Sequence, residues 1–384
     1  MRSITADYIF NGEAFFENAL LVCSNDGSVL EFLPVADKSQ LDTAEKFSGT
    51  LCPGFVNAHC HLELSHMMGK VTPGKGFAKF ATELIPQRNW ISPEDIAAVC
   101  VQADEEMYAS GIQAVGDISN VDFSFAAKAK SKIAYHTFVE VLGLNPAVAK
   151  KMFDDGQKLK SFAPESKSLS PHAPYSVSAE LLQLISGSES GSVITIHNQE
   201  SLAESEFTRD GSGSVNEIFK MFGLDLSFYK PSGKNSLQTT LPHLSGDFHL
   251  MLVHNTFSSA DDIQWARGQH DHLYWCLCPN ANLYIEKSLP EVMMMRENNC
   301  RIVVGTDSLA SNYHLNILEE LKVLHKNFPK VPVAELLTWA TKNGAEALRM
   351  NSLGSFEPGK KPGIVCLDGV SPHEITMKAK SKRV

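Results

Sequence analysis

The segment Val193-Ile194-Thr195-Ile196-His197 is apolar on both faces of the strand that it predicts, and it ends on a histidine. The segment Arg301-Ile302-Val303-Val304 has the same two-sided apolar character. Strands that are buried on both faces are typical of parallel sheets covered by helices on both sides. The two segments therefore predict an α/β fold.

Strand-like segments of this kind recur along the chain and alternate with amphipathic helices. We expect eight strands, at Cys52–Asn57, Gln113–Ile118, Ala134–Val141, Ser168–Pro171, Val193–His197, His249–His254, Tyr274–Cys278 and Arg301–Gly305. The amphipathic segments between them include Pro93–Ser110, Glu180–Ile185 and Leu315–Asn327. This alternation favours a (β/α)8 TIM-like barrel, with a doubly wound parallel sheet as the alternative.

The two ends of the chain do not follow this alternation. Residues 1–50 contain short strand-like runs separated by turn residues, and the chain from Gly354 onward is again a turn followed by a strand. We predict that residues 1–50 and 355–384 form one small β-sandwich domain, and that residues 51–354 form the catalytic barrel. The stretch Ser201–Asp247 is interpreted as a long connection that carries substrate or subunit contacts.

Composition and charge narrow the class of protein. The 384 residues are 43% hydrophobic and 20% charged, as in an ordinary globular enzyme, and the formal net charge is −10. An acidic surface repels nucleic acids and anionic membranes, so neither is an expected partner. No stretch approaches the roughly 18 apolar residues of a membrane span, and the first residues lack the apolar core of a signal peptide. The eight cysteines follow no disulfide pattern, so we expect a cytoplasmic protein.

Two histidines close the first expected barrel strand. His59 and His61 are two residues apart, so their side chains point to the same side of a strand. Two imidazoles placed in this way can bind one metal ion. A His-x-His pair is weak evidence when it stands alone, because such pairs also occur without a metal.

Three further polar residues stand where other apolar strands end. His197 follows Val193–Ile196, His254 follows Met251-Leu252-Val253, and Asp307 lies just after Ile302-Val303-Val304. Active-site groups project from this end of the strands in (β/α)8 barrels. Any one of the three could be an ordinary surface residue, but together with the two earlier histidines they predict a metal site. Histidine and aspartate suit zinc or ferrous iron.

A glutamate lies close to this set. Glu200 follows His197 by three residues and is therefore just past a strand end. A carboxylate at this position could move a proton between an attacking water and a leaving group. The alternative is a glutamate in the first turn of a helix, where a negative charge is favourable.

Three motifs carry a family resemblance: Pro53-Gly54-Phe55-Val56-Asn57-Ala58-His59-Cys60-His61, His172-Ala173-Pro174-Tyr175-Ser176-Val177-Ser178 and Gly305-Thr306-Asp307-Ser308. Together they resemble the amidohydrolase superfamily, and more narrowly its branch of cytosine/guanine deaminases and chlorohydrolases. The resemblance covers roughly residues 50 to 370 in the right order. It implies a homodimer, and one divalent metal ion, zinc or iron, bound by His59, His61, His197 and Asp307.

The resemblance also implies roles in catalysis and in substrate binding. His254 and Asp307 would orient the attacking water, Glu200 would contact the substrate and shuttle the proton, and His172 would bind the substrate. Binuclear relatives carry a carboxylated lysine at the end of the fourth strand, where this chain has Ser170-Pro171-His172, so a mononuclear site is expected. The residues Asn198-Gln199 differ from the small or apolar residues common in the branch, which leaves the substrate subclass open.

The leading functional hypothesis is a hydrolytic deaminase that releases ammonia from an aminated N-heterocycle. A purine or purine nucleoside of the aminofutalosine, adenosine or guanine type fits it, and Phe77, Phe80 and Trp90 either stack on the flat ring or simply pack on a helix face. The alternatives are a chlorohydrolase or amide/ureide-cleaving hydrolase with the same metal, and a non-catalytic binding protein. Glu200 favours deamination, because ammonia must be protonated to leave whereas chloride need not be.

Overall fold

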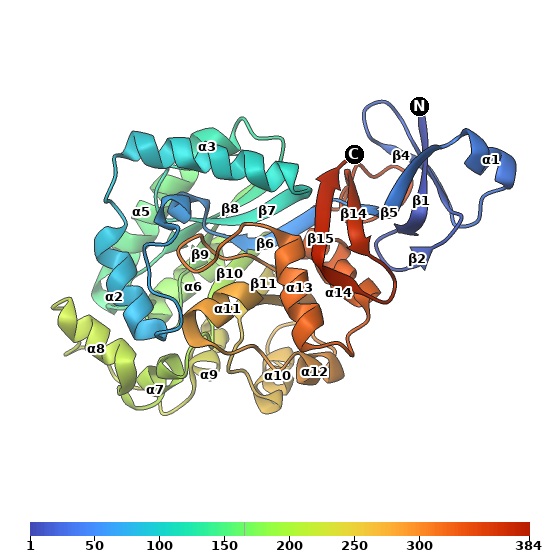
Figure 1. Cartoon of the computed structure of the whole chain (residues 1–384). Helices are drawn as coiled ribbons and strands as arrows, with labels where there is room; N and C mark the ends of the chain where they lie inside the picture. The colour runs from blue at the N-terminus through green and yellow to red at the C-terminus, as the bar shows by residue number, and fades with distance from the viewer. Residues whose placement is uncertain (165) are drawn as a thin grey trace.

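The computed structural model describes residues 1–164 and 166–384 (Figure 1). Its centre contains two four-stranded parallel sheets. The first consists of β6 (Phe55–Cys60), β7 (Ile112–Ser119), β8 (Ala134–Val141) and β9 (Lys167–Pro171). The second consists of β10 (Val193–Asn198), β11 (His249–His254), β12 (Leu273–Leu277) and β13 (Ile302–Val304).

The two sheets meet along both pairs of edges. Between β9 and β10, the backbone N–H of His197 donates to the carbonyl of His172 at 2.9 Å. Between β13 and β6, the N–H groups of Thr306 and Asp307 donate to the carbonyl of His59 at 3.0 and 3.1 Å. Parallel strands arranged in this way form a TIM-barrel-like α/β fold, so the predicted fold class is confirmed at this level. Continuous eight-stranded closure stays a prediction.

The helices lie mainly outside the parallel strands (Figure 1). The α-helices are α1 (Lys38–Thr43), α2 (Phe77–Gln87), α3 (Pro93–Ala109), α4 (Phe125–Lys128), α5 (Ala149–Phe162), α6 (Ala179–Ser188), α7 (Leu202–Asp210), α8 (Gly213–Met221), α9 (Ser236–Thr240), α10 (Ala260–Arg267), α11 (Pro279–Glu286), α12 (Val292–Glu297), α13 (Ile317–Asn327), α14 (Val333–Trp339) and α15 (Lys342–Ala347). Short 3-10 helices cover η1 (Leu62–Met67), η2 (Pro146–Val148) and η3 (Leu241–His243). None of the helices in the described part of the chain combines the length and apolar character needed to span a bilayer.

Helix positions follow local signals in the sequence. The helix expected at Pro93–Ser110 is α3, whose first turn is fixed by Pro93 and by Ser92, because the Ser92 hydroxyl accepts from the N–H of Asp95 at 3.1 Å. The long connection expected at Ser201–Asp247 instead contains the short helices α7, α8, α9 and η3.

The first expected strand, Cys52–Asn57, was placed wrongly. Instead, β5 (Glu45–Pro53) ends and β6 begins at Phe55, and the two strands belong to different sheets. Gly54 lies at the crossing, where a Cβ atom would stand 2.7 Å from the carbonyl oxygen of Pro362 and 2.8 Å from Cβ of Gln113. Only glycine allows the chain to pass between the sheets at so close an approach.

Both ends of the chain contribute to one mixed sheet, seen on the right of Figure 1. The path runs β15-β14-β5-β1-β3-β4, and β2 pairs with β1. These strands are β1 (Arg2–Phe10), β2 (Phe15–Phe16), β3 (Leu20–Cys23), β4 (Val29–Leu33), β5, β14 (Ile364–Val370) and β15 (Ile375–Arg383). Their core includes Ile4, Ile9, Leu21, Leu51 and Phe356. The description of this unit as a sandwich, and the domain boundaries near residues 50 and 355, remain predictions.

Candidate metal centre and active site

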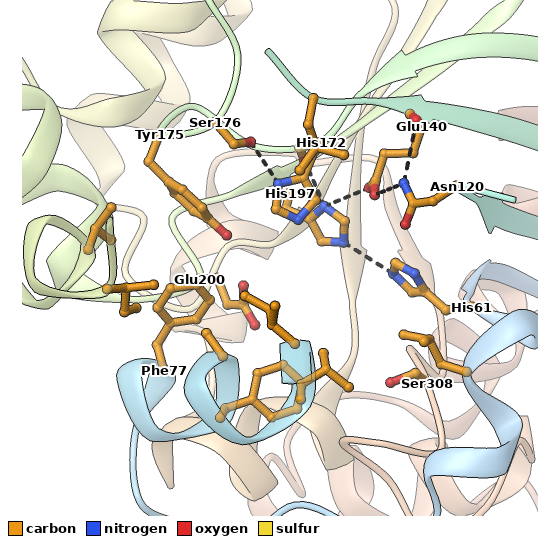
Figure 2. Close-up of a pocket in the computed structure, with 18 of the residues that line it drawn as sticks. His61, Phe77, Asn120, Glu140, His172, Tyr175, Ser176, His197, Glu200 and Ser308 are labelled. Carbon is orange, nitrogen blue, oxygen red and sulfur yellow. Dashed lines mark hydrogen bonds and ion pairs between the residues drawn. The ribbon is translucent and has the colours of Figure 1, made fainter. Parts of the chain in front are cut away.

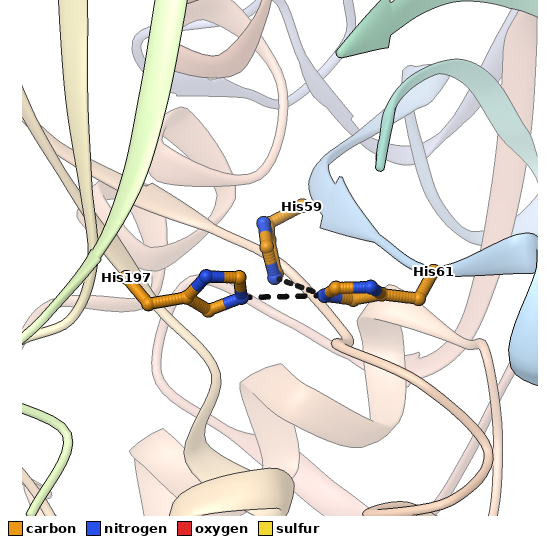
Figure 3. Close-up of side chains that lie close together, drawn as sticks. All are labelled: His59, His61 and His197. Atoms are coloured by element: carbon orange, nitrogen blue, oxygen red, sulfur yellow. Dashed lines mark hydrogen bonds between the residues drawn. The ribbon is translucent and has the colours of Figure 1, made fainter. Parts of the chain in front are cut away.

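Three imidazole rings meet at the end of the central strands (Figure 3). The Nε2 atom of His61 lies 3.2 Å from Nε2 of His59 and 3.3 Å from Nε2 of His197. All three side chains are buried. The structure thus brings together three of the residues that the sequence singled out, from strands β6 and β10.

The local backbone explains this arrangement. His59 lies in β6 and His61 directly follows it, so the two side chains share one side of the strand. Gly305, just after β13, packs against His59, and a Cβ atom at Gly305 would stand 2.8 Å from both Cβ and the carbonyl oxygen of His59. Strand β13 therefore approaches β6 closely enough to bring Asp307 to the same cluster.

Asp307 supplies a carboxylate to this group. Its Oδ1 atom lies 3.7 Å from Nε2 of His59 and 3.5 Å from Nε2 of His61, while its Oδ2 accepts from the hydroxyl of Ser311 at 2.6 Å. Burial alone would raise the pKa of Asp307, but the adjacent His59 and the imidazoles of His61 and His254 hold it well below its ordinary value. Asp307 is therefore an anion at every physiological pH.

The protonation pattern of the cluster suits a divalent cation. Nδ1 of His197 donates to the carbonyl of His172 at 2.7 Å, so its Nε2 carries a lone pair that faces the other two rings. Burial lowers the pKa of His59 to about 4 and that of His61 well below 6.5, which keeps both rings neutral. Three neutral ring nitrogens and one carboxylate oxygen match the donor set that zinc or iron takes in proteins.

His254 and Glu200 lie on the pocket side of the cluster. Nδ1 of His254 donates to the side-chain oxygen of Asn282 at 3.0 Å, and its Nε2 lies 3.7 Å from Oε1 of Glu200. Burial raises the pKa of Glu200 to about 8, although the nearby His197 imidazole opposes the shift. A carboxyl group with such a pKa can both give and accept a proton near neutral pH.

His172 stands on the opposite wall from α2 (Figure 2). The hydroxyl of Ser176 donates to the carbonyl of Ala173 at 3.1 Å and lies 2.7 Å from Nδ1 of His172. The Ser176 oxygen can therefore accept from Nδ1–H, which leaves Nε2 of His172 as a hydrogen-bond acceptor. Burial lowers the pKa of His172 to about 4. The neutral ring is suited to contact a polar group of a ligand.

One cavity of about 210 Å³ is lined by the predicted site residues other than His59, namely His61, His172, His197, Glu200, His254 and Asp307. One wall is apolar and comes from α2 and α8, with Phe77, Phe80 and Ile218 among its residues. The aromatic residues Phe77 and Phe80 thus lie where the stacking hypothesis requires. Trp90 lies outside this lining and is 49% exposed, with Nζ of Lys70 at 3.7 Å from its ring centre, so the stacking interpretation does not hold for it.

Sequence reasoning missed three polar residues of the cavity. Glu140, Asn120 and Arg88 all line it, and Figure 2 shows Glu140 and Asn120 on the same side as His172 and His197. Glu140 lies near the end of β8, directly after the apolar residues Phe138 and Val139, and a carboxylate at the end of a strand is a signal that could have found it. Burial would raise its pKa, but the imidazoles of His172, His197 and His61 lower it to about 2. Asn120 and Arg88 lie in loops and at a helix end, where the sequence gives no comparable signal.

The family of this chain follows from a comparison with known proteins. The sequence model of the Amidohydrolase family matches residues 50–384. The chain belongs to the amidohydrolase family. Membership and the histidine cluster together support a divalent metal ion at this centre, whereas the choice between zinc and iron stays open.

Curated relatives of this amidohydrolase include several deaminases. It is 28% identical over 329 residues to an adenosine deaminase of Helicobacter pylori, covering 82% of this chain and 78% of the relative. It is 29% identical over 332 residues to an aminodeoxyfutalosine deaminase of Nitratiruptor sp., covering 83% of this chain and 78% of the relative.

Solved structures with the same fold include an aminofutalosine deaminase of Helicobacter pylori in complex with methylthio-coformycin. It has a TM-score of 0.80 and 24% identity, covering 97% of this chain and 94% of that chain. An atrazine chlorohydrolase of Arthrobacter aurescens complexed with zinc has a TM-score of 0.75 and 17% identity, covering 97% of this chain and 88% of that chain. At these identities the likeness concerns the fold.

Proposed function

We propose that this amidohydrolase is a hydrolytic deaminase, which releases ammonia from an aminated purine or purine nucleoside. Glu200 is the observation that carries the proposal. Its buried carboxyl group faces the cavity beside the histidine cluster, and its pKa is raised to about 8. Expulsion of ammonia needs a group that first accepts and then donates a proton, and Glu200 has the position and the proton affinity for both steps.

We also propose the assignments within the centre. His59, His61, His197 and Asp307 would hold one zinc or iron ion, which when bound would lower the pKa of water and so supply a nucleophile near neutral pH. The end of β9, the fourth of the parallel strands, offers no bridging lysine, because the chain there reads Ser170-Pro171-His172. The lysine of this strand, Lys167, lies at its start and donates from Nζ to the carbonyl of Ala163 at 2.6 Å. The absence of a lysine from the strand end supports a mononuclear centre.

The protein side chains carry the proton through the reaction. Glu200 accepts a proton from the attacking water and passes it to the neighbouring ring nitrogen, as the water oxygen bonds to the ring carbon that bears the amino group and the C=N double bond becomes single. The proton of the new hydroxyl group then moves through Glu200 to the amino nitrogen, the C–N bond breaks, and ammonia leaves while a carbonyl group remains on the ring. His254 orients the water through Nε2, since Asn282 fixes the hydrogen on its other nitrogen.

The cavity supports a flat heterocycle as the substrate. Its apolar wall from α2 and α8 can cover the ring faces, while His172 meets a polar ring edge. The deaminase relatives are named for adenosine and aminodeoxyfutalosine, which supports the purine nucleoside class.

The proposal also covers the architecture and the state of the protein in the cell. We propose a closed barrel over residues 51–354 and a terminal β-sandwich domain of residues 1–50 and 355–384. We further propose that the protein is a homodimer and lies in the cytoplasm.

A panel of substrates tests the deaminase assignment. Metal-loaded protein is incubated with adenosine, 5'-methylthioadenosine, aminodeoxyfutalosine, guanine and a chlorinated triazine, and the release of ammonia and chloride is measured. We expect ammonia from at least one aminated purine, loss of activity with a chelator, and recovery with zinc or iron. Chloride release without ammonia release would support the chlorohydrolase alternative instead.

A further inference from the structure

Glu140 is a buried carboxylate that the proposed chemistry does not use. Its side chain is only 3% exposed, and Oε2 accepts from the amide of Asn120 at 2.8 Å. In the part of the chain that the structure describes, Oε1 has no hydrogen-bond partner. An unpaired buried carboxylate oxygen destabilises a fold, so its presence calls for a functional explanation.

The unpaired oxygen faces a proposed metal ligand. Oε1 of Glu140 lies 3.5 Å from Nδ1 of His197, and a dashed line marks this contact in Figure 2. The hydrogen on that nitrogen is already donated to the carbonyl of His172 at 2.7 Å. Glu140 therefore acts on the His197 ring through its negative charge rather than as its main hydrogen-bond acceptor.

A chain of polar contacts holds Glu140 in this place. Nη2 of Arg88 donates to Oε1 of Glu63 at 2.8 Å and to Oδ1 of Asn120 at 2.9 Å, and Asn120 in turn donates to Glu140. The backbone N–H of Asn120 also donates to Oε2 of Glu63 at 3.1 Å. Three side chains, those of Glu63, Arg88 and Asn120, thus fix the Glu140 carboxylate beside the His197 ring.

The net charge of the proposed metal site suggests a function for the Glu140 carboxylate. The proposed ligands comprise three neutral imidazoles and the single negative charge of Asp307, so a divalent ion would leave one positive charge unbalanced. We propose that Glu140 is a positioning residue that balances this charge and holds the His197 ring, and thereby raises the affinity of the centre for a divalent metal. The proposal rests on the metal site of the proposed function.

A second metal ion is the competing explanation. Glu140, His172 and His197 offer ligand atoms within 4.8 Å of one another. Both nitrogens of His197 are engaged, however, because Nδ1 donates to a carbonyl and Nε2 faces His61. Two protein ligands would remain, which is fewer than a stable zinc or iron site needs.

The substitution Glu140→Gln tests the proposal, because glutamine keeps the size of the side chain and removes its charge. The first measurement is the affinity of metal-free protein for zinc, by competition with a chromophoric chelator. The second is the thermal midpoint Tm of the metal-free protein. Asp104→Asn is the matched control, because Asp104 is also buried and accepts from the hydroxyl of Tyr135 at 2.7 Å, away from the centre.

We expect Glu140→Gln to bind zinc about 10- to 100-fold more weakly. Its metal-free Tm should stay close to that of the unaltered protein, because glutamine can still accept from Asn120 and, among the described residues, Oε1 has no hydrogen-bond partner to lose. Asp104→Asn should show the reverse, with a lower Tm and unchanged zinc affinity. If Glu140→Gln does not fold, Asn120→Ala should still lower the zinc affinity, because it releases the Glu140 carboxylate.

Three results would overturn the proposal. Unchanged zinc affinity in Glu140→Gln with a raised KM would make Glu140 a substrate contact. A lower metal-free Tm with unchanged zinc affinity would make it a structural residue. Two zinc ions per chain, of which Glu140→Gln loses one, would establish a second metal site. Failure of the unaltered protein to bind zinc or iron would instead refute the proposed function itself.

Discussion

At the scale of single residues, the backbone at two site positions is unusual. His254 has φ 74° and Asp307 has φ 58°, and both angles lie in the left-handed region that residues with a side chain seldom adopt. His254 is the last residue of β11 and Asp307 lies three residues after β13, so the chain turns sharply where each strand ends. Strain of this kind persists where the surrounding structure enforces it, and it aims both side chains at the histidine cluster.

The contacts of His61 lead to a prediction about metal content. Its Nε2 touches the corresponding atoms of both His59 and His197, so it lies at the centre of the cluster. We expect one zinc or iron ion per chain in the purified protein, and loss of this ion and of activity in His61→Ala. His136→Ala is the control, because His136 is buried and its two ring nitrogens lie against the hydroxyls of Ser166 and Ser168 rather than in the cluster. Elemental analysis measures both, and full metal content in His61→Ala would contradict the assignment.

The sequence was informative about residues whose position depends on one strand. His59, His61, His197, His254 and Asp307 could be selected because each ends an apolar run, and the structure brings all five together. It was uninformative where a role depends on contacts across the fold. Glu140 gains its significance from Asn120 and His197, which lie 20 and 57 positions away in the chain and are adjacent only after folding.

At the scale of elements, short helices close one side of the cavity. Helices α2 and α8 contact each other, although more than 120 residues separate them in the chain, and both contribute apolar side chains to the cavity (Figure 1). Helix α7 follows Glu200 closely in the chain and holds this residue in place at the cavity. In its first turn, Oε1 of Glu204 accepts from the backbone N–H of Gln199 at 2.7 Å and so fixes the segment that contains Glu200.

The buried carboxyl group of Glu204 predicts a pH dependence of stability. Burial raises its pKa to about 8 from the ordinary value of 4.5. Between these pH values the folded protein keeps a proton that the unfolded chain releases, so the free energy of unfolding falls as pH rises. In Glu204→Gln this part of the decrease should disappear, because glutamine stays neutral and can still accept from Gln199.

Urea unfolding of the metal-free protein at pH 5 and pH 8 provides the measurement. The unaltered protein should lose more stability between the two pH values than Glu204→Gln. Glu206→Gln, a less buried position of the same helix, should behave as the unaltered protein does. An identical loss of stability in Glu204→Gln and in the unaltered protein would show that Glu204 does not carry the effect.

The spacing of apolar residues predicted helices best where one face of the helix is buried, as in α3. It failed at Cys52–Asn57, because two consecutive apolar strands in different sheets read as one continuous run. It also missed the helices within Ser201–Asp247, since α7, α8 and α9 are short and the residues between them are rich in serine and glycine. Their apolar residues become recognisable as a helix face only when they meet α2.

At the scale of the whole molecule, the last strand ties the terminal sheet to the parallel strands. Arg383, at the end of β15, donates from Nε to the carbonyl of Tyr108 at 3.0 Å, from Nη1 to Oε1 of Gln113 at 2.8 Å and from Nη2 to the carbonyl of Ile112 at 2.7 Å. Its guanidinium also lies 3.8 Å from the centre of the Tyr108 ring. One residue thus joins β15 to the start of β7.

This junction predicts that the terminal sheet stabilises the whole protein. Arg383→Met should lower the free energy of unfolding by about 1–3 kcal/mol, because it removes three hydrogen bonds that the guanidinium donates. Lys382→Ala, at an exposed position of the same strand, should change it by less than about 0.5 kcal/mol. Chemical denaturation with a fold-sensitive probe measures both, and equal effects would argue against a specific role for the junction.

The sequence indicated that both chain ends have strand and turn chemistry, and the structure joins them in one sheet. It did not reveal that β5 continues to Pro53, or that β5 lies between β1 and β14 in that sheet. Such an order depends on pairings between residues more than 300 positions apart, as between Val365 and Cys52, for which local patterns carry no information.

The central claim is that Glu200 transfers the proton that allows ammonia to leave. Glu200→Gln keeps size and polarity but cannot carry a proton, so it tests the claim most directly. The measurement is kcat for an amino substrate and for its chloro analogue, in metal-loaded Glu200→Gln and in the Glu204→Gln control. We expect the metal to be retained, ammonia release to fall by about 10²- to 10⁴-fold, and the chloro analogue to lose much less. Near-normal ammonia release by metal-loaded Glu200→Gln would contradict the account.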